Sequence, residues 1–133
     1  MAEIARVQEA TKALPANDFK RFGELMNDSH DSLNTDFEVS CDELNELVEI
    51  ARSTPGVLGS RMSGGGFGGC TVTLVSAEQA DALIKAFETK YSGYEKDAAF
   101  KSSPSAGAGA FTFAVAPVQA SIDGAPAEAT TQE

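Results

Sequence analysis

The stretch Gly59-Ser-Arg-Met-Ser-Gly-Gly-Gly-Phe-Gly-Gly-Cys70 is the one feature of this sequence that ordinary folding needs do not explain. Five glycines lie immediately around Phe67, and each costs up to about 1 kcal/mol relative to alanine in regular structure. Residues 57–62 are extended in character, and residues 70–75 alternate threonine with valine and leucine. This pattern predicts a β-hairpin with an unusual loop.

A loop of this composition lets bare backbone approach a ligand closely and point consecutive N–H groups at an anion such as phosphate. Ser63 adds a hydroxyl to these donors. The predicted anion-binding loop comprises Ser63, Gly64, Gly65, Gly66, Phe67, Gly68 and Gly69. The alternative interpretation is a flexible hairpin connection whose glycines merely allow positive φ angles.

Two other glycine-rich motifs are excluded by their context. Gly64, Gly66 and Gly69 satisfy the G-x-G-x-x-G spacing of dinucleotide-binding folds, but that motif requires a helix to begin there, and a strand pattern follows instead. A Walker A loop requires Lys-Ser or Lys-Thr after its last glycine, whereas Cys70 and Thr71 follow here. The sequence therefore predicts neither a Rossmann fold nor a P-loop.

Four helices are predicted from apolar residues that recur at helical spacing. Their expected bounds are residues 1–14, 17–34, 40–54 and 76–93. Polar residues near three of the starts predict N-terminal caps. The predicted caps are Asn17, the pair Ser40 and Glu43, and the pair Ser76 and Gln79.

The second half of the chain predicts a small antiparallel sheet packed by helices, so that the expected fold class is α+β. Residues 98–102 and 111–115 are each expected to supply a strand, with the turn-rich residues 104–109 between them. Residues 117–133 are rich in alanine, proline and polar side chains, and they predict a disordered tail. We therefore expect one domain over residues 1–116.

Charge and composition narrow the classes of partner. The 133 residues carry a formal net charge of −10, which disfavours binding to nucleic acid or to an anionic membrane surface. The sequence contains no apolar run long enough to cross a membrane and no signal-peptide pattern at its start, which predicts a cytoplasmic protein. Cys41 and Cys70 have neither zinc-site nor redox-motif spacing and are expected to be reduced.

Several blocks of the sequence together resemble the galactokinases, a family of the GHMP kinase superfamily. The loop segment resembles their motif S-R-M-T-G-G-G-F-G-G-C, with Ser63 in place of threonine. Further blocks in the family's order are Phe22-Gly-Glu-Leu-Met, Ser29-His-Asp-Ser-Leu33, Val39-Ser-Cys-Asp-Glu-Leu44 and Pro104-Ser-Ala-Gly-Ala108. Asp42 stands where the family usually has proline, and aspartate also suits a first helical turn.

The resemblance implies the carboxy-terminal domain of these kinases, a ferredoxin-like α+β unit whose glycine loop lies beside the sugar and the phosphates. It implies ATP, Mg²⁺ and galactose as cofactors and substrate, with catalytic residues and Mg²⁺ ligands in a preceding N-terminal domain. We therefore expect an N-terminally truncated domain with no catalytic or metal-binding residue of its own, inactive alone. A non-catalytic galactose sensor and an N-acetylgalactosamine kinase are the alternatives within the same fold.

Other polar residues have competing interpretations. His30 is the only histidine, and its place between apolar helix positions favours a packing or capping role over catalysis. Arg61 suits either pairing with a phosphate or carboxylate or a solvated strand position. Glu24, Asp28 and Asp31 could suggest a metal cluster, but an acidic helix face is typical of solvated residues. None of these residues is placed in the catalytic set.

Overall fold

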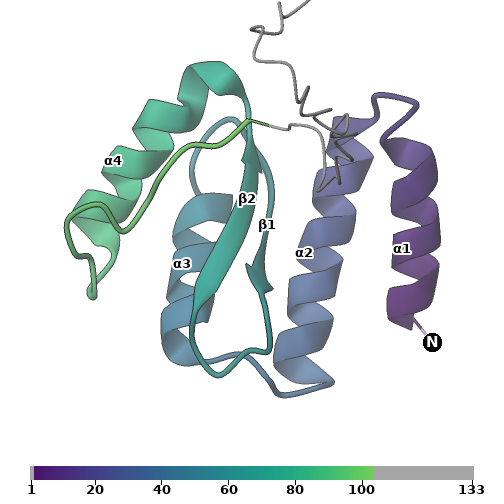
Figure 1. The fold of residues 1–133 in the computed structure, drawn as a ribbon, viewed down its shortest axis with the longest axis horizontal. Helices are drawn as coiled ribbons and strands as arrows, with labels where there is room; N and C mark the ends of the chain where they lie inside the picture. The colour runs from purple at the N-terminus through teal and green to yellow at the C-terminus, as the bar shows by residue number, and fades with distance from the viewer. Residues whose placement is uncertain (1, 104–133) are drawn as a thin grey trace, which may run out of the picture. The chain divides into compact units, whose positions relative to one another are not determined.

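A two-stranded antiparallel hairpin lies at the centre of the computed structural model, which describes residues 2–103 (Figure 1). Strand β1 (Val57–Ser63) pairs with strand β2 (Cys70–Val75). The register places Ser63 opposite Cys70 at the end where the loop begins. The hairpin predicted from the glycine-rich stretch and its flanks is therefore confirmed.

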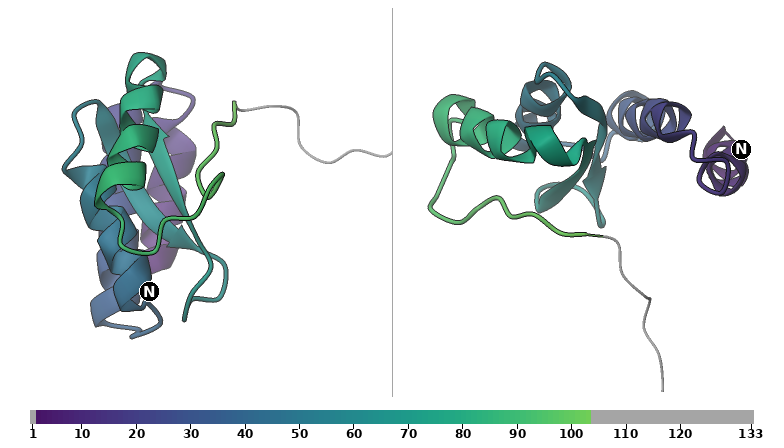
Figure 2. Two further views of the ribbon diagram at one scale, coloured as in Figure 1. Left: turned by 90° about the vertical axis from the view of Figure 1, so that its left-hand side faces the viewer. Right: turned by 90° about the horizontal axis from the view of Figure 1, so that it is seen from above.

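Helices lie on both sides of the hairpin. The helices are α1 (Ala2–Ala13), α2 (Phe19–Thr35), α3 (Asp42–Arg52) and α4 (Ala80–Lys90), and α4 follows a short 3-10 turn, η1 (Ala77–Gln79). Figure 2 shows α2 beside the hairpin with α1 outside it, and α3 and α4 on the opposite side. The expected α+β class is confirmed, and the sheet has two strands within residues 2–103.

The apolar stripes of α3 and α4 meet in a hydrophobic core. Leu44 and Val48 of α3 are almost completely buried, and Ala51 lies in one cluster with Leu83 and Phe87 of α4. Burial of each large side chain stabilises the fold by about 1.5–3 kcal/mol relative to leaving that side chain exposed. These contacts fix α3 and α4 against the hairpin side chains that pack on the same cluster.

Helix α2 touches β1 at the level of the backbone. A Cβ atom on Gly23 would lie 2.2 Å from the carbonyl oxygen of Leu58, and one on Gly59 would lie 2.2 Å from the carbonyl oxygen of Gly23. Only glycine fits at either position. The irregular register between Val57 and Gly59 coincides with this crossing.

The predicted helix caps differ from those in the structure by one residue or by their hydrogen bonds. Asp18, not Asn17, caps α2 by accepting a hydrogen bond from the Arg21 N–H (3.0 Å). Asn17 instead adopts a positive φ of 57°, which turns the chain between α1 and α2. A polar residue next to a helix start is an ambiguous signal because either of two neighbours can accept that bond.

The capping pairs expected for the third and fourth helices are also wrong. Cys41 is the residue at the start of α3, and Ser40 donates its hydroxyl to Asn45 instead of capping the helix. Ser76 makes no side-chain cap bond, and its carbonyl oxygen accepts the Gln79 N–H within a 3-10 turn. The Ser40 hydroxyl thus has another local partner, whereas Ser76 and Gln79 interact through their main-chain groups.

The strand expected over residues 98–102 does not form. Lys101 in this segment donates to Asp81 of α4 at 2.7 Å, and Ala99 packs on the core cluster, so the segment covers α4 without pairing to the sheet. The expected strand over residues 111–115, the turn at residues 104–109 and the tail over residues 117–133 lie outside the described residues.

Candidate functional site

The loop that joins β1 to β2 adopts backbone angles that favour glycine. Gly64, Gly66, Gly68 and Gly69 have φ values of 82°, 85°, 136° and 100°. Side chains rarely occupy this region because of the clash between the Cβ atom and the following carbonyl. Phe67 is the exception, with φ of 60°. The loop therefore needs most of its glycines for its shape.

One side of the loop is held by the connection between α2 and α3. The main-chain N–H of Phe67 donates to the carbonyl oxygen of Val39 at 2.8 Å. A Cβ atom on Gly66 would lie 2.0 Å from the same oxygen, so the backbones touch there. The loop is thus anchored at one point near its middle.

Four other N–H groups of the loop have no main-chain acceptor among the described residues. Within residues 2–103, the N–H groups of Gly64, Gly65, Gly68 and Gly69 donate to no main-chain oxygen. A Cβ atom built on any of these four glycines meets no described atom within 4 Å, so open space adjoins the backbone. A row of backbone N–H groups in open space suits an anion such as a phosphate.

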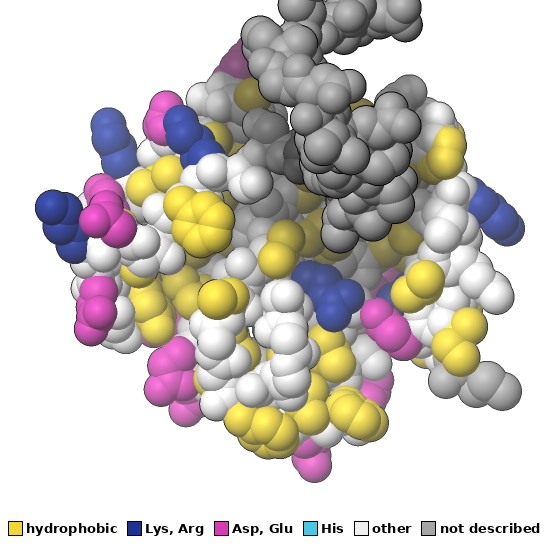
Figure 3. All heavy atoms as spheres, in the orientation of Figure 1, with side chains coloured by type: hydrophobic (Ala, Val, Ile, Leu, Met, Phe, Trp, Pro, Cys, Tyr) yellow, Lys and Arg dark blue, Asp and Glu magenta, His cyan; other side chains and the backbone are white. Residues whose placement is uncertain are grey.

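Apolar side chains flank this loop. Phe67 is 76% exposed, and Phe37, on the neighbouring connection between α2 and α3, is 73% exposed. Figure 3 shows hydrophobic side chains gathered at the end of the molecule where the loop and this connection lie. Ser63 and Cys70 are exposed at the two strand ends. The structure therefore brings the predicted site residues together on one exposed loop.

A groove runs from Ser63 along the hairpin, between the hairpin and the helices α1 and α2. It has a volume of about 470 Å³ and a mostly apolar lining that includes Val7, Phe22 and Val72. Val7 and Val72 are more than half exposed, at 56% and 53%. The stripe of α1 predicted from apolar spacing therefore borders an open groove.

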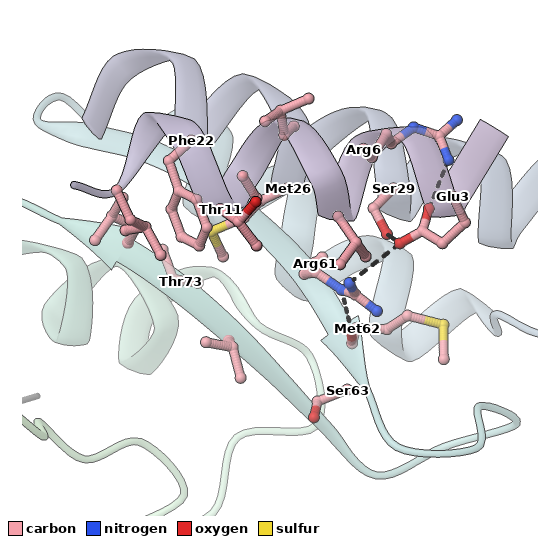
Figure 4. A pocket seen from close by; sticks show the side chains of 16 residues that line it. Glu3, Arg6, Thr11, Phe22, Met26, Ser29, Arg61, Met62, Ser63 and Thr73 are labelled. Carbon is pink, nitrogen blue, oxygen red and sulfur yellow. Dashed lines mark hydrogen bonds and ion pairs between the residues drawn. The ribbon is translucent and has the colours of Figure 1, made fainter. Parts of the chain in front are cut away.

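Charged side chains lie at one end of the groove (Figure 4). Glu3 Oε1 accepts a hydrogen bond from the Ser29 hydroxyl (2.7 Å), and Glu3 Oε2 accepts one from Arg6. The Arg61 guanidinium lies 3.6 Å from Glu3 Oε1. Burial opposes ionisation of Glu3, but the bonds from Ser29 and Arg6 outweigh it, so the pKa of Glu3 is lowered. Arg61 thus pairs with a carboxylate of its own chain.

His30 has a structural contact rather than a place at the loop surface. Its side chain is buried, and Nδ1 accepts the main-chain N–H of Met62 at 3.2 Å. Burial lowers the pKa of His30, and the charge of Arg52 lowers it further against the opposing charge of Asp31. The neutral imidazole is therefore the form that the fold favours.

Asn27 makes a second contact of this kind that the sequence did not reveal. Its Oδ1 accepts the Ser60 N–H at 2.9 Å and the Arg52 Nε–H at 2.9 Å. The only signal in the sequence is its spacing from Gly23 and His30, which places all three on one face of α2. Spacing alone does not identify a strand as the partner.

The acidic residues of α2 do not converge on a metal site. Glu24 pairs with Arg21 at 3.0 Å, and Asp31 pairs with Arg52 at 2.7 Å. Among the described residues no group of three His, Cys, Asp or Glu side chains is arranged to hold a metal ion. In that same part of the chain, no helix combines the length and the apolar character needed to cross a membrane.

Comparison with known proteins agrees with this geometry. The sequence profile described as "GHMP kinases C terminal" matches residues 10–93. Galactokinase from Bos taurus is 53% identical over 93 residues, and that from Homo sapiens is 52% identical over 93 residues. Each match covers 70% of this chain and 24% of the relative, so the chain spans about a quarter of the length of these curated relatives.

Two solved structures are similar to the described fold. Lactococcus lactis galactokinase complexed with galactose superposes with a TM-score of 0.63 and 46% identity, over 65% of this chain and 22% of that chain. L. major mevalonate kinase in complex with R-mevalonate gives a TM-score of 0.60 and 38% identity, over 66% of this chain and 27% of that chain. The chain belongs to the GHMP kinases and corresponds to the C-terminal region of the galactokinases among them.

Proposed function

We propose that this chain acts as the C-terminal domain of a galactokinase, which transfers the γ-phosphoryl group of ATP to the anomeric hydroxyl of galactose. In this reaction the bond from the γ-phosphorus to the ADP oxygen breaks, a bond to the sugar oxygen forms, and the hydroxyl proton passes to a base. About half of the residues are identical to galactokinases over the matched region, and one similar structure holds galactose. A cytoplasmic location, where ATP is available, is part of this proposal.

The glycine loop supplies the contribution of this domain to the reaction. The amides of Gly64, Gly65, Gly68 and Gly69 have no main-chain acceptor among residues 2–103, and open space adjoins them. This observation carries the proposal. Fixed N–H donors stabilise charge that develops on a transferring phosphoryl group, since they need no reorganisation during the reaction. The hydroxyl of Ser63 lies at the start of the same row of donors.

The donors of this loop fit ATP phosphates but not Mg²⁺. N–H groups cannot ligate a cation, and the described residues offer no cluster of acidic or imidazole side chains for a metal ion. We propose that the Mg²⁺ ligands and the catalytic base belong to the part of a galactokinase that precedes this region, as the family resemblance implies. Positioning and charge neutralisation both require that part, so we expect this chain alone to bind Mg-ATP weakly or undetectably.

A chimera tests this function. In the Bos taurus galactokinase, the matched 93-residue segment is replaced by the corresponding segment of this chain. We expect the purified chimera to form galactose phosphate and ADP in equal amounts, and the same enzyme with the segment deleted to form neither. A chimera that is folded and binds ATP but does not phosphorylate galactose would overturn the proposal. Micromolar binding of Mg-ATP by the isolated chain would overturn the expectation that this domain is insufficient.

A further inference from the structure

The outer edge of β1 is closed by side chains of a helix. Among residues 2–103 the sheet has two strands, so the edge of β1 that faces away from β2 has no neighbouring strand. The N–H groups of Ser60 and Met62 lie on this edge, two residues apart, as successive outward donors of a strand do. Asn27 Oδ1 accepts the first at 2.9 Å, and His30 Nδ1 accepts the second at 3.2 Å.

The sequence of α2 makes this arrangement possible. Gly23, Asn27 and His30 follow one another at i, i+4 and i+7, so they form one stripe along the helix. Because Gly23 and Gly59 have no side chains, the two backbones approach closely at the first position of the stripe. That approach brings the next two positions within hydrogen-bonding distance of the strand edge.

Both acceptors are held in place by their surroundings. Arg52 of α3 donates to Asn27 Oδ1 from Nε and to the Asn27 carbonyl oxygen from Nη2, at 2.9 and 2.8 Å. His30 is 3% exposed, and the residues that donate to the two acceptors, Ser60 and Met62, are 0% and 1% exposed. A buried N–H group whose acceptor is lost has no water to replace it, so removal of either acceptor disturbs the strand.

The His30 contact lies directly beside the glycine loop. Met62 is followed by Ser63 and then by the loop amides, whereas Ser60 is three residues away from Ser63. The second anchor of the loop is the bond from the Phe67 N–H to Val39. The amides of Gly64 and Gly65 therefore lie between the His30 contact and the Val39 contact, and both contacts set where these amides point.

We propose that His30 is a positioning residue, which holds β1 at Met62 so that the amides of Gly64 and Gly65 are aligned with the phosphates. This inference rests on the proposed function of the loop. Displacement of a reacting group by about 1 Å can lower a rate by two orders of magnitude, so a small shift at Met62 has a large effect on transfer. Because His30 is buried, it would act through β1 and not by direct contact with the ligand.

Protonation of His30 reverses its role in this contact, because imidazolium donates from both nitrogens and accepts from neither. The charged groups around it are Asp31 on its own helix, Arg52 and Glu49 on α3, and Arg61 on β1. Burial and Arg52 lower the pKa of His30. The contact is therefore intact near neutral pH and breaks on acidification below the ordinary histidine pKa of about 6.5.

Two variants separate the hydrogen bond from packing. His30→Leu keeps a side chain of similar volume without an acceptor, whereas His30→Asn keeps an acceptor oxygen near the place of Nδ1. In nitrogen-15 spectra of the 133-residue chain, we expect His30→Leu to shift the amide peaks of Gly64 and Gly65 and to accelerate Met62 exchange by about tenfold or more. His30→Asn should restore the wild-type positions of the Gly64 and Gly65 peaks and the wild-type exchange rate of Met62. Asn27→Leu is the matched control, because it removes the more distant contact and should leave the loop peaks in place.

The same spectra give a test without substitution. On acidification of the wild-type chain the Gly64 and Gly65 peaks should move as they do in His30→Leu, while in His30→Asn they should stay. Equal spectra for His30→Leu and His30→Asn, or an equal loop shift from Asn27→Leu, would overturn the positioning role. The positioning role would also be overturned if the Gly64 and Gly65 peaks of the wild-type chain did not move with pH.

The kinetic test uses the Bos taurus chimera. We expect His30→Leu to lower kcat about tenfold with a smaller change in KM for galactose, and His30→Asn to recover most of kcat. An active chimera whose kcat is the same with and without His30→Leu would overturn the inference. An inactive chimera, with the spectral effects still present, would overturn the proposed function while leaving the His30 contact supported.

Discussion

The stem and the loop of the hairpin differ in how their backbone donors are used. In the stem even the outward N–H groups of β1 have acceptors, which are the side chains of Asn27 and His30. The glycines Gly23 and Gly59 bring α2 against the strand. In the loop the Phe67 N–H has a partner, whereas the four glycines Gly64, Gly65, Gly68 and Gly69 border open space. The comparison teaches that the N–H groups of the stem are used within the fold, and we propose that those of the loop are kept for a ligand.

The largest effect on stability is expected in the stem, for Gly59→Ala. The new Cβ atom would lie 2.2 Å from the Gly23 carbonyl oxygen and 2.6 Å from the Gly23 Cα, and backbone atoms cannot rotate away. We expect the free energy of unfolding to fall by about 3 kcal/mol, as in overpacked cores. Urea unfolding of the chain measures this, and a loss below about 1 kcal/mol would show that α2 and β1 do not touch as described.

A smaller effect is expected at the anchored point of the loop, for Gly66→Ala. The Cβ atom would lie 2.0 Å from the Val39 carbonyl oxygen, and the φ of 85° is unfavourable for alanine. Because the loop is exposed and can move, we expect a loss of about 2 kcal/mol in the free energy of unfolding. Gly65→Ala is the control. Equal stability of the two variants would contradict the anchoring of the loop at Val39.

A still smaller effect is expected from pH. Burial lowers the pKa of His30 in the folded chain, so between the folded and the ordinary value the unfolded chain binds more protons. Stability from this group is complete above about pH 6.5 and is lost as the pH falls toward the folded pKa, by at most about 1.4 kcal/mol per unit. Urea unfolding at pH 7.5 and 5.5 should show a larger difference for wild type than for His30→Asn. If the change in unfolding free energy between the two pH values were equal in wild type and His30→Asn, groups other than His30 would be its cause.

The secondary structure was largely predictable because it depends on local pattern. The alternation of residues 70–75 and the apolar spacing in α3 and α4 gave elements that the structure confirms. Helix starts were less accurate, since Asp18 caps where Asn17 was expected. The strand expected at residues 98–102 was wrong, because Ala99 packs on the core cluster while Phe100 stays exposed, and the segment does not pair with the sheet.

The site was only partly predictable, for the same physical reason. The glycine loop is continuous in sequence, so its composition and its resemblance to the galactokinase motif were enough to predict its shape and to propose it as a binding loop. The contact that fixes it joins His30 to Met62, 32 residues apart, through a side-chain nitrogen and a backbone N–H. A backbone donor has no signal in the amino-acid sequence. Likewise Gly23 and Gly59 are recognisable as a pair only when the two backbones are seen to meet.

Substitution of Gly65 tests the central claim most directly, because this position separates the shape of the loop from its use. Its φ is not in the left-handed region, and a Cβ atom there meets no described atom within 4 Å, so Gly65→Ala should change stability by less than about 0.5 kcal/mol. If bare backbone at Gly65 approaches the phosphates, the chimera carrying Gly65→Ala should lose about tenfold or more in kcat/KM for galactose phosphorylation. Unchanged stability together with unchanged kcat/KM would contradict the account.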